Sequence, residues 1–309
     1  MKILGIGNAI VDVICKVDEN FISQNNLTKG NMKLIFDENE FRNLLTNLKI
    51  EKTISGGSVA NSIVGLSQLG NEVGFIGKIS NDDFGIKYEN GLKKENVDFI
   101  YFKKNEMLPT GTCLILVTPD SERTMCTFLG IAGKINEEDI NINAVKKSEM
   151  IFLEGYLWDE GDPKKAFEKA INSANKVAMS LSDKFCVDRH KKHFLELVKN
   201  KLDITFANED EISSLIDAKN FDETIEFGKS IKRCLIITRG SKGAISIIGN
   251  EVNEVGIENN LKLVDLTGAG DLFAAGYLHG YLNNFSFKDS LRKGTEMASK
   301  IIQQIGARL

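Results

Sequence analysis

Short runs of β-branched and other apolar residues alternate along the chain with longer stretches in which apolar positions recur every three to four residues. The short runs predict buried strands and the longer stretches predict amphipathic helices, because the two structures repeat with different periods. Strands are expected at 2–6, 73–77, 149–153, 176–181, 203–206, 234–238 and 244–248. Helices are expected at 57–69, 84–95, 163–174, 191–199, 208–216, 222–230, 271–282 and 287–304. This alternation is typical of an α/β fold whose largely parallel sheet is covered by helices on both faces.

A second group of strand-like runs departs from this rhythm. These runs lie at 11–17, 31–36, 99–103, 111–117 and 124–129, and no crossover helix separates the last three. We expect them to form a small mixed or antiparallel sheet that acts as a lid over a ligand site. An extension of the main sheet at its edge is the alternative. The expected division is a large α/β domain from 1–10, 52–97 and 131–309, and a lid from 11–51 and 98–130.

Composition narrows the class of protein. The 309 residues are 42% hydrophobic and 27% charged, as in ordinary soluble globular proteins. The net charge of −4 argues against a nucleic-acid binder, which would need many phosphate contacts. Five scattered cysteines with no CxxC motif favour reduced thiols in the cytoplasm. No run of eighteen apolar residues occurs, so we expect no membrane span.

The run 265–276 carries the clearest chemical signal. Gly268, Ala269 and Gly270 can turn tightly at the start of a predicted helix and point backbone N–H groups at one spot. A helix N-terminus adds partial positive charge, so this turn predicts an anion hole. Asp271 follows directly and could take a proton from a hydroxyl, which together describes phosphoryl transfer to an alcohol. The pattern taken alone would also fit an ordinary glycine-rich helix cap.

A second set of polar residues lies near the start of the chain. Gly56 and Gly57 open a predicted helix and let the backbone approach a ligand, while Asn61 lies one turn further on. Asn8 and Asp12 follow the first strand, and Asp12 stands in an apolar stretch where a carboxylate needs partners such as sugar hydroxyls. A capping turn and a strand-end Asp are the plainer alternatives.

Two further turns suit a nucleotide. Asn208 and Glu211 open a helix at the end of a predicted parallel strand, where they could either cap the helix or orient Mg²⁺ through waters. A turn after strand 234–238 could contact phosphates through its backbone or be a simple β-turn; its candidates are Thr238, Arg239, Gly240 and Gly243. No Walker A pattern occurs, which excludes a P-loop enzyme.

These pieces, in this order, resemble the ribokinase-like (pfkB) family of sugar and nucleoside kinases. The segment 56–61 (GGSVAN) with 70–85 resembles the family's N-terminal signature, and 265–280 (DLTGAGDLFAAGYLHG) resembles its C-terminal signature. The resemblance implies a Rossmann-like three-layer α/β/α domain with a β-sheet lid that uses ATP and Mg²⁺. It also implies that Asp271 is the general base and that residues 268–270 form the anion hole. The residues matching the family's magnesium, phosphate and nucleotide contacts are Asn208, Glu211 and 238–240.

Within that family the chain is similar to the adenosine kinases, notably in 29–36 (KGNMKLIF), 109–113 and 181–185. The resemblance implies that Asp12, Gly57 and Asn61 bind a ribose, and that Arg123 in the lid neutralises the transferred phosphate. Tyr156 and Trp158 fall near the expected nucleobase pocket but do not match residue for residue.

The expected activity is phosphorylation of the 5′-hydroxyl of adenosine or a similar purine nucleoside. A sugar kinase acting on ribose, fructose or a keto-sugar acid is the alternative within the family. A nucleoside-binding regulatory protein without turnover is the alternative outside it. A small-molecule substrate is the only expected partner besides a second copy of the chain, with monomer and homodimer both open.

Overall fold

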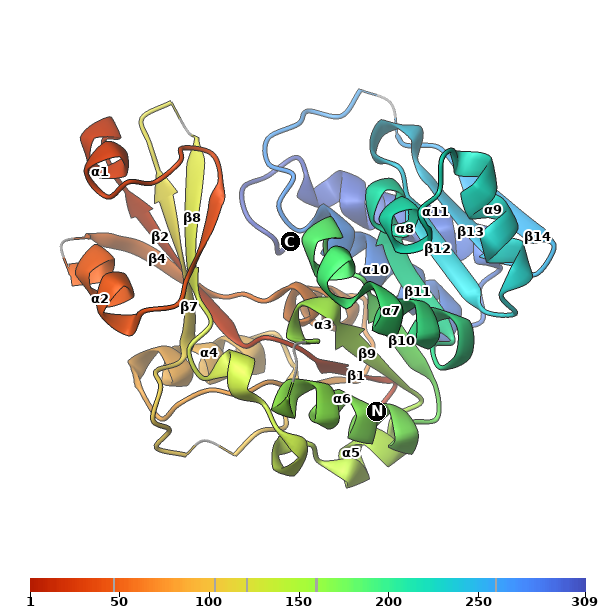
Figure 1. Cartoon of the computed structure of the whole chain (residues 1–309), viewed down its shortest axis with the longest axis horizontal. Helices are drawn as coiled ribbons and strands as arrows, with labels where there is room; N and C mark the ends of the chain where they lie inside the picture. Colours follow the sequence, from red (N-terminus) through yellow and green to blue (C-terminus); the bar gives the residue numbers. More distant parts are fainter. Residues whose placement is uncertain (47, 103, 121, 159–160, 259) are drawn as a thin grey trace.

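The computed structural model describes residues 1–46, 48–102, 104–120, 122–158, 161–258 and 260–309, which form a large and a small β-sheet (Figure 1). The large sheet has the strand order β14-β13-β12-β11-β10-β9-β1-β5-β6. Its strands are β1 (Ile3–Ile6), β5 (Val73–Ile76), β6 (Asp98–Phe99), β9 (Met150–Glu154), β10 (Val177–Ser180), β11 (Ile204–Asn208), β12 (Cys234–Thr238), β13 (Ala244–Ile248) and β14 (Glu251–Val255). All pairs are parallel except those made by β13, so the expected mostly parallel α/β fold is confirmed.

Helices cover both faces of the large sheet. They are α3 (Ser58–Gln68), α4 (Asp83–Lys94), α5 (Ile142–Lys147), α6 (Asp162–Ser173), α7 (Lys184–Asn200), α8 (Glu209–Ile216), α9 (Phe221–Ser230), α10 (Ala269–Leu282) and α11 (Phe287–Ile301). Successive strand residues point to opposite faces, so Ile3 packs with α3 and α10 while Leu4 packs with α6 and α7. This two-sided burial explains why the parallel strands are apolar throughout rather than alternating.

The small sheet forms a separate lobe beside the large one (Figure 1). Its order is β3-β8-β7-β2-β4, from β2 (Ile10–Lys16), β3 (Met32–Ile35), β4 (Ile50–Ser55), β7 (Gly111–Val117) and β8 (Arg123–Phe128), accompanied by α1 (Glu19–Gln24) and α2 (Glu38–Thr46). The sheet is mixed, because β2 pairs with β7 in parallel and with β4 antiparallel.

Two expected boundaries of the small sheet are wrong. The run 99–103 contributes no strand to it, since β6 pairs in parallel with β5 as the edge of the large sheet. The physical reason is that α4 provides a crossover from β5, which makes β5–α4–β6 a parallel unit. Residues 52–55, expected in the large domain, belong to β4 and pair with β2. Residue 103 lies outside the described residues.

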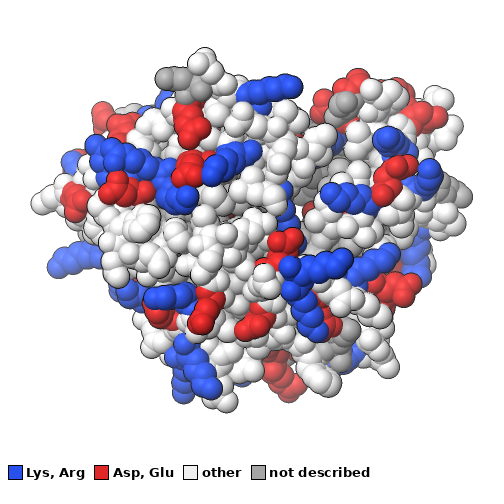
Figure 2. Space-filling view, turned by 180° about the vertical axis from the view of Figure 1, so that it is seen from behind, with Lys and Arg blue, Asp and Glu red and all other residues white. Residues whose placement is uncertain are grey.

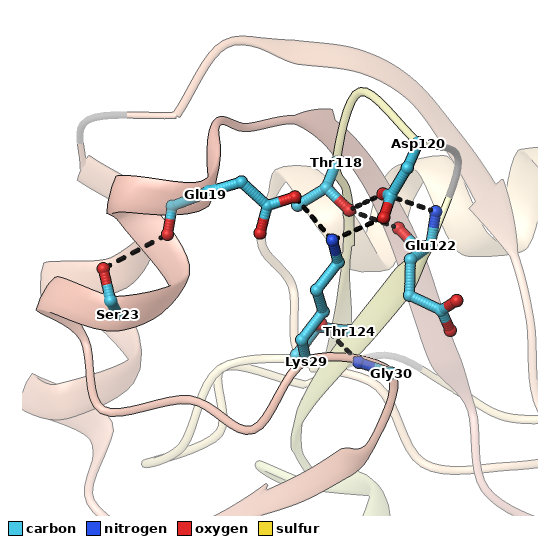
Figure 3. Close-up of polar contacts among 8 residues, drawn as sticks. All are labelled: Glu19, Ser23, Lys29, Gly30, Thr118, Asp120, Glu122 and Thr124. Carbon is cyan, nitrogen blue, oxygen red and sulfur yellow. Dashed lines mark hydrogen bonds and ion pairs between the residues drawn. The ribbon is translucent and has the colours of Figure 1, made fainter.

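A charged cluster holds the outer end of the small sheet together (Figure 3). The Lys29 ammonium bonds to the carboxylates of Glu19 and Asp120, which joins the start of α1 to the turn between β7 and β8. The Gly30 amide donates to Thr124 Oγ1 on β8 at 3.1 Å. The loop before β3 is therefore fixed to the same hairpin that carries Arg123.

The surface is mixed in charge. On the face drawn in Figure 2, lysines and arginines lie next to aspartates and glutamates rather than apart from them. None of the helices formed by the described residues combines the length and the apolar character needed to cross a lipid bilayer.

Candidate active site

A cavity of about 650 Å³ lies where the small sheet meets the large domain. Asp12 on β2, Asn61 on α3 and Arg123 on β8 line it, together with the segment 305–309 that follows α11. Residues expected to bind an acceptor therefore meet at one place, although they come from both lobes. Figure 1 shows the end of the chain in the same region between the lobes.

Asp271 lies in the first turn of α10, with its carboxylate held by α3. Ser58 Oγ donates to Asp271 Oδ1 at 2.6 Å, and Asn61 Nδ2 donates to Asp271 Oδ2 at 3.0 Å. Burial raises the pKa of Asp271 to about 6, while the hydrogen bonds from Ser58 and Asn61 and the charge of Arg308 counteract a larger rise. The two sequence motifs thus form one site in which a carboxylate is ionised near neutral pH and can accept a proton.

The turn before Asp271 has the conformation that an anion hole requires. Gly268 precedes the helix with φ +80°, and no side chain caps the first turn. The Ala269 amide is already used, because it donates to the Leu266 carbonyl at 3.2 Å. At Gly270 the space that a Cβ would take has no neighbour among the described residues within 4 Å, which leaves room for a phosphate. Gly270 is therefore the open part of the turn, whereas Gly268 is packed against Ala307.

Two glycines set the geometry of the acceptor side. Gly57 has φ +99°, and a Cβ there would lie 2.2 Å from the carbonyl oxygen of Asn8. A Cβ on Gly56 would lie 2.4 Å from Asp12 Oδ2, so only glycine lets this carboxylate sit against the start of α3. Burial raises the pKa of Asp12 to about 7, with Arg308 opposing the rise and Asp271 adding to it.

Asn8 supports this arrangement from below. It is buried, and its Nδ2 donates to Glu154 Oε1 at 2.7 Å. The other oxygen of Glu154 accepts from the Val59 amide at 3.0 Å, which ties the end of β9 to the first turn of α3. Asn8 thus stabilises the start of α3 through Glu154 and does not line the first cavity. Sequence reasoning missed Glu154. The signal that could have found it is a carboxylate at the end of an apolar strand, where a buried charge needs polar partners.

A second cavity, of about 550 Å³, lies on the other side of the α10 N-terminus. Thr238, Gly240 and Gly243 from the turn after β12 line it, together with Gly270 and Phe273 of α10. The loop that leads into α10 and the first turn of this helix therefore border both cavities: Thr267 lines the first and Gly270 the second. A phosphate donor and an acceptor could meet there.

Arg239 does not line the second cavity. Its guanidinium pairs with Glu209 at 3.3 Å and Glu254 at 2.9 Å, and it stacks on the Phe221 ring at 3.9 Å from the ring centre. Arg239 thus fixes the turn between β12 and β13 and leaves the cavity to its neighbours.

Asn208 and Glu211 form a reciprocal cap on α8. The Asn208 side chain accepts from the Glu211 amide, and Glu211 accepts from the Asn208 amide and side chain at 3.0 and 2.6 Å. Burial raises the pKa of Glu211 to about 7. Within the described residues no group of three or more His, Cys, Asp or Glu side chains could hold a metal. Glu211 offers at most a single carboxylate.

Arg123 is joined to the anion-hole loop. Its Nη1 lies 2.6 Å from Asp265 Oδ2, which also accepts from the Gly306 amide at 2.8 Å. Thr267 Oγ1 donates to Asp265 Oδ1 at 2.7 Å. The small sheet, the loop before α10 and the 305–309 segment therefore meet at one carboxylate.

The two aromatic candidates lie outside the lining of the first cavity. Tyr156 is partly exposed, and its hydroxyl donates to the Ser182 carbonyl at 3.3 Å. Trp158 is buried and packs against Phe167 and Phe194, so its role is in the core.

Comparisons with known proteins identify the family to which the chain belongs. Residues 6–309 match the family model described as pfkB family carbohydrate kinase. The adenosine kinase from Sinorhizobium meliloti superposes with a TM-score of 0.90 and 35% identity over 100% of this chain and 95% of that one. A probable sugar kinase from Rhizobium etli superposes with a TM-score of 0.89 and 34% identity, over 99% of this chain and 94% of that one. A 5-dehydro-2-deoxygluconokinase from Clostridium beijerinckii is 26% identical over 88% of this chain and 85% of its own length.

The fold and its relatives define a phosphotransferase that acts on a hydroxyl group. The chain belongs to the pfkB family of carbohydrate and nucleoside kinases.

Proposed function

We propose that this chain transfers the γ-phosphoryl group of ATP to the 5′-hydroxyl of adenosine or a similar purine nucleoside. The observation that carries the proposal is the contact of Asn61 with Asp271, 3.0 Å apart, at a cavity that Asp12 also lines. This pairs groups that bind vicinal hydroxyls with a carboxylate that can accept a proton. The 35% identity to an adenosine kinase over the whole chain supports the nucleoside.

On the acceptor side, Asp12 and Asn61 bind the ribose hydroxyls and direct the 5′-oxygen toward Asp271. As that oxygen attacks, the O–H proton passes to Asp271. A bond forms from the 5′-oxygen to the γ-phosphorus, while the bond from that phosphorus to the bridging oxygen breaks and ADP leaves. The backbone N–H groups around Gly268 and Gly270 stabilise the charge that develops on the phosphoryl oxygens.

The residues present fit ATP and Mg²⁺. The second cavity is lined mainly by apolar and small residues, which suits a purine, and it opens at Gly270, where the space for a Cβ is empty among the described residues. Mg²⁺ usually binds through phosphates, waters and one or two carboxylates, and we assign Glu211, acting through water, as its protein donor. When bound, the ion neutralises phosphate charge.

The small sheet acts as a lid in this proposal. Arg123 reaches the loop before α10 and would lie close to the transferred phosphate once both substrates are bound. A closed lid excludes water, which would otherwise accept the phosphoryl group.

A sugar kinase is the second candidate, because curated relatives include 5-dehydro-2-deoxygluconokinases. The cavity lining includes Arg123, Arg308 and Lys87, cations that could bind an acidic sugar. The alternative keeps Asp271 and the anion hole and changes only the acceptor.

The deciding experiment measures ADP release from MgATP with adenosine, inosine, guanosine, ribose, fructose and 5-dehydro-2-deoxygluconate supplied separately. Turnover on adenosine well above that on the free sugars is the expected result. Preferred turnover on a sugar would replace the nucleoside with that sugar. Tight adenosine binding without turnover would instead favour a regulatory protein.

A further inference from the structure

Arg308 has no part in the mechanism so far, yet it lies inside the acceptor site. It belongs to the 305–309 segment, which is held in place at several points. The Gly306 amide donates to Asp265, and Gln68 Nε2 donates to the Leu309 carbonyl at 3.1 Å. Ala307 packs so closely on Gly268 that a Cβ on that glycine would lie 2.7 Å from it. This segment is therefore built against the anion-hole turn.

Arg308 and Asp271 bind opposite ends of the Asn61 amide. Arg308 Nε donates to Asn61 Oδ1 at 3.1 Å, while Asn61 Nδ2 donates to Asp271 Oδ2 at 3.0 Å. A guanidinium has only donors, so it can bind only the oxygen of the amide. The amide nitrogen is then forced to face Asp271. Without Arg308, the amide oxygen would lose its partner, and the Asn61 side chain would be free to rotate away from Asp271.

The charge of Arg308 matters as well as its geometry. The site gathers the carboxylates of Asp12, Asp271 and Glu154, and Arg308 is a cation facing the first two. Its Nη2 is buried without a hydrogen-bond partner among the described residues. Buried donors are rarely left unpaired, so this nitrogen marks a place for an oxygen that the protein itself does not supply.

We propose that Arg308 is a positioning residue of the acceptor site, which turns the Asn61 amide toward Asp271 and places a positive charge beside the carboxylates of Asp271 and Asp12. An oxygen of the bound acceptor takes the remaining donor, Nη2. This rests on the proposed function in one respect, namely that Asp271 is the base.

The experiment compares Arg308→Ala and Arg308→Lys with wild type, and uses Arg292→Ala as a matched control. Arg292 is an exposed arginine of α11 that pairs with Asp289 on the same helix. For each variant we would measure kcat and KM for the acceptor and for ATP, the pH dependence of kcat/KM, and the melting temperature. Loss of a hydrogen bond to a charged group predicts a fall in kcat/KM for the acceptor of about 10- to 100-fold in Arg308→Ala, with KM for ATP near wild type.

The pH profile separates a positioning role from a structural one. In Arg308→Ala the acid limb should move to higher pH, because Asp271 loses a neighbouring positive charge that lowers its pKa. Arg308→Lys keeps the charge but not the Nε donor, so it should hold the acid limb in place while kcat/KM for the acceptor still falls. An acid limb and acceptor KM in Arg308→Ala equal to those of Arg292→Ala would overturn the proposal.

The design also separates this inference from the choice of substrate. If wild type turns over a free sugar rather than adenosine, the proposed function fails, but the same variants assayed with that sugar still decide the role of Arg308. An unchanged melting temperature with an altered pH profile supports positioning. A lowered melting temperature with an unchanged profile of the remaining activity would contradict it.

Discussion

Arg123 Nη1 lies 2.6 Å from Asp265 Oδ2, and this ion pair joins strand β8 of the small sheet to the loop that leads into α10. The side chains of Arg123 and Asp265 are both largely shielded from solvent, so the pair is less screened than the surface pairs of the protein. Asp265 also fixes Thr267 and Gly306, which border the anion-hole turn. The position of the small sheet and the shape of the turn before α10 are therefore linked through one carboxylate.

Removing this link should loosen the lid. Arg123→Ala should lower kcat by about 10- to 100-fold and raise the fraction of ATP lost to water, because the small sheet closes less tightly. Hydrogen exchange of β7 and β8 amides, measured by mass spectrometry, should become faster. The matched control is Arg42→Ala, which removes an exposed arginine that pairs with Glu38 inside the same lobe. Equal behaviour of the two variants would show that the contact with Asp265 has no role in closure.

Asp271→Asn should abolish most turnover while the fold persists. The amide keeps the size of the carboxylate but cannot accept a proton, so kcat should fall by about 10²- to 10⁴-fold. Binding of a non-hydrolysable ATP analogue, measured by calorimetry, should stay near wild type. Asp222→Asn changes an exposed carboxylate in the first turn of α9 and serves as the control. Retention of more than half of the wild-type kcat in Asp271→Asn would remove this residue from the chemistry.

The pH dependence of the reaction should report the ionisation of Asp271. Its pKa is raised to about 6, chiefly by burial, so activity should decline as pH falls through this value and the carboxylate becomes protonated. Asp12 and Glu154, whose pKa values are each raised to about 7, and the Arg308 cation face the same region and will broaden the transition. The measurement is kcat/KM for the acceptor from pH 5 to 8 at saturating MgATP. A profile that stays flat down to pH 5 would be inconsistent with a base of this pKa.

Gly57 should be indispensable for stability as well as for binding. Gly57→Ala combines an unfavourable positive φ with a contact of 2.2 Å to the Asn8 carbonyl. Gly70→Ala is the control, because Gly70 also has a positive φ of 83° but has no neighbour among the described residues within 4 Å of its Cβ position. In urea unfolding both variants should lose about 1–2 kcal/mol from the backbone term. Gly57→Ala should lose about 1–3 kcal/mol more from crowding, and equal losses would contradict the observed packing.

The parts of the site that sequence reasoning predicted are those written in local patterns. The glycines before Asp271 and before Ser58 predict helix starts, and the apolar runs predict a buried parallel sheet. Both features can be predicted because they depend on residues that are neighbours in the sequence. The structure then brings Asp271 and Asn61 together, as a single acceptor site requires.

What sequence reasoning missed depends on contacts between distant residues. Arg308 is 247 positions from Asn61, and Glu154 is 146 from Asn8, so neither pair leaves a local pattern. Strand β4 was missed because its residues Ile50–Ser55 alternate too weakly and carry charges on an exposed edge. The run 99–103 has the aromatic residues of a strand. However, α4 returns the chain so that β6, which includes Phe99, pairs in parallel with β5 at the edge of the large sheet.

The most direct test of the central claim is phosphorus NMR of the products formed from adenosine and MgATP. We expect ADP to appear together with one new phosphomonoester, whose signal is split by the two protons of the 5′ carbon. We expect neither signal to grow with Asp271→Asn. Formation of ADP with inorganic phosphate alone, or of a phosphomonoester on a ring hydroxyl, would contradict the assignment of Asp271 as the base for a 5′-hydroxyl.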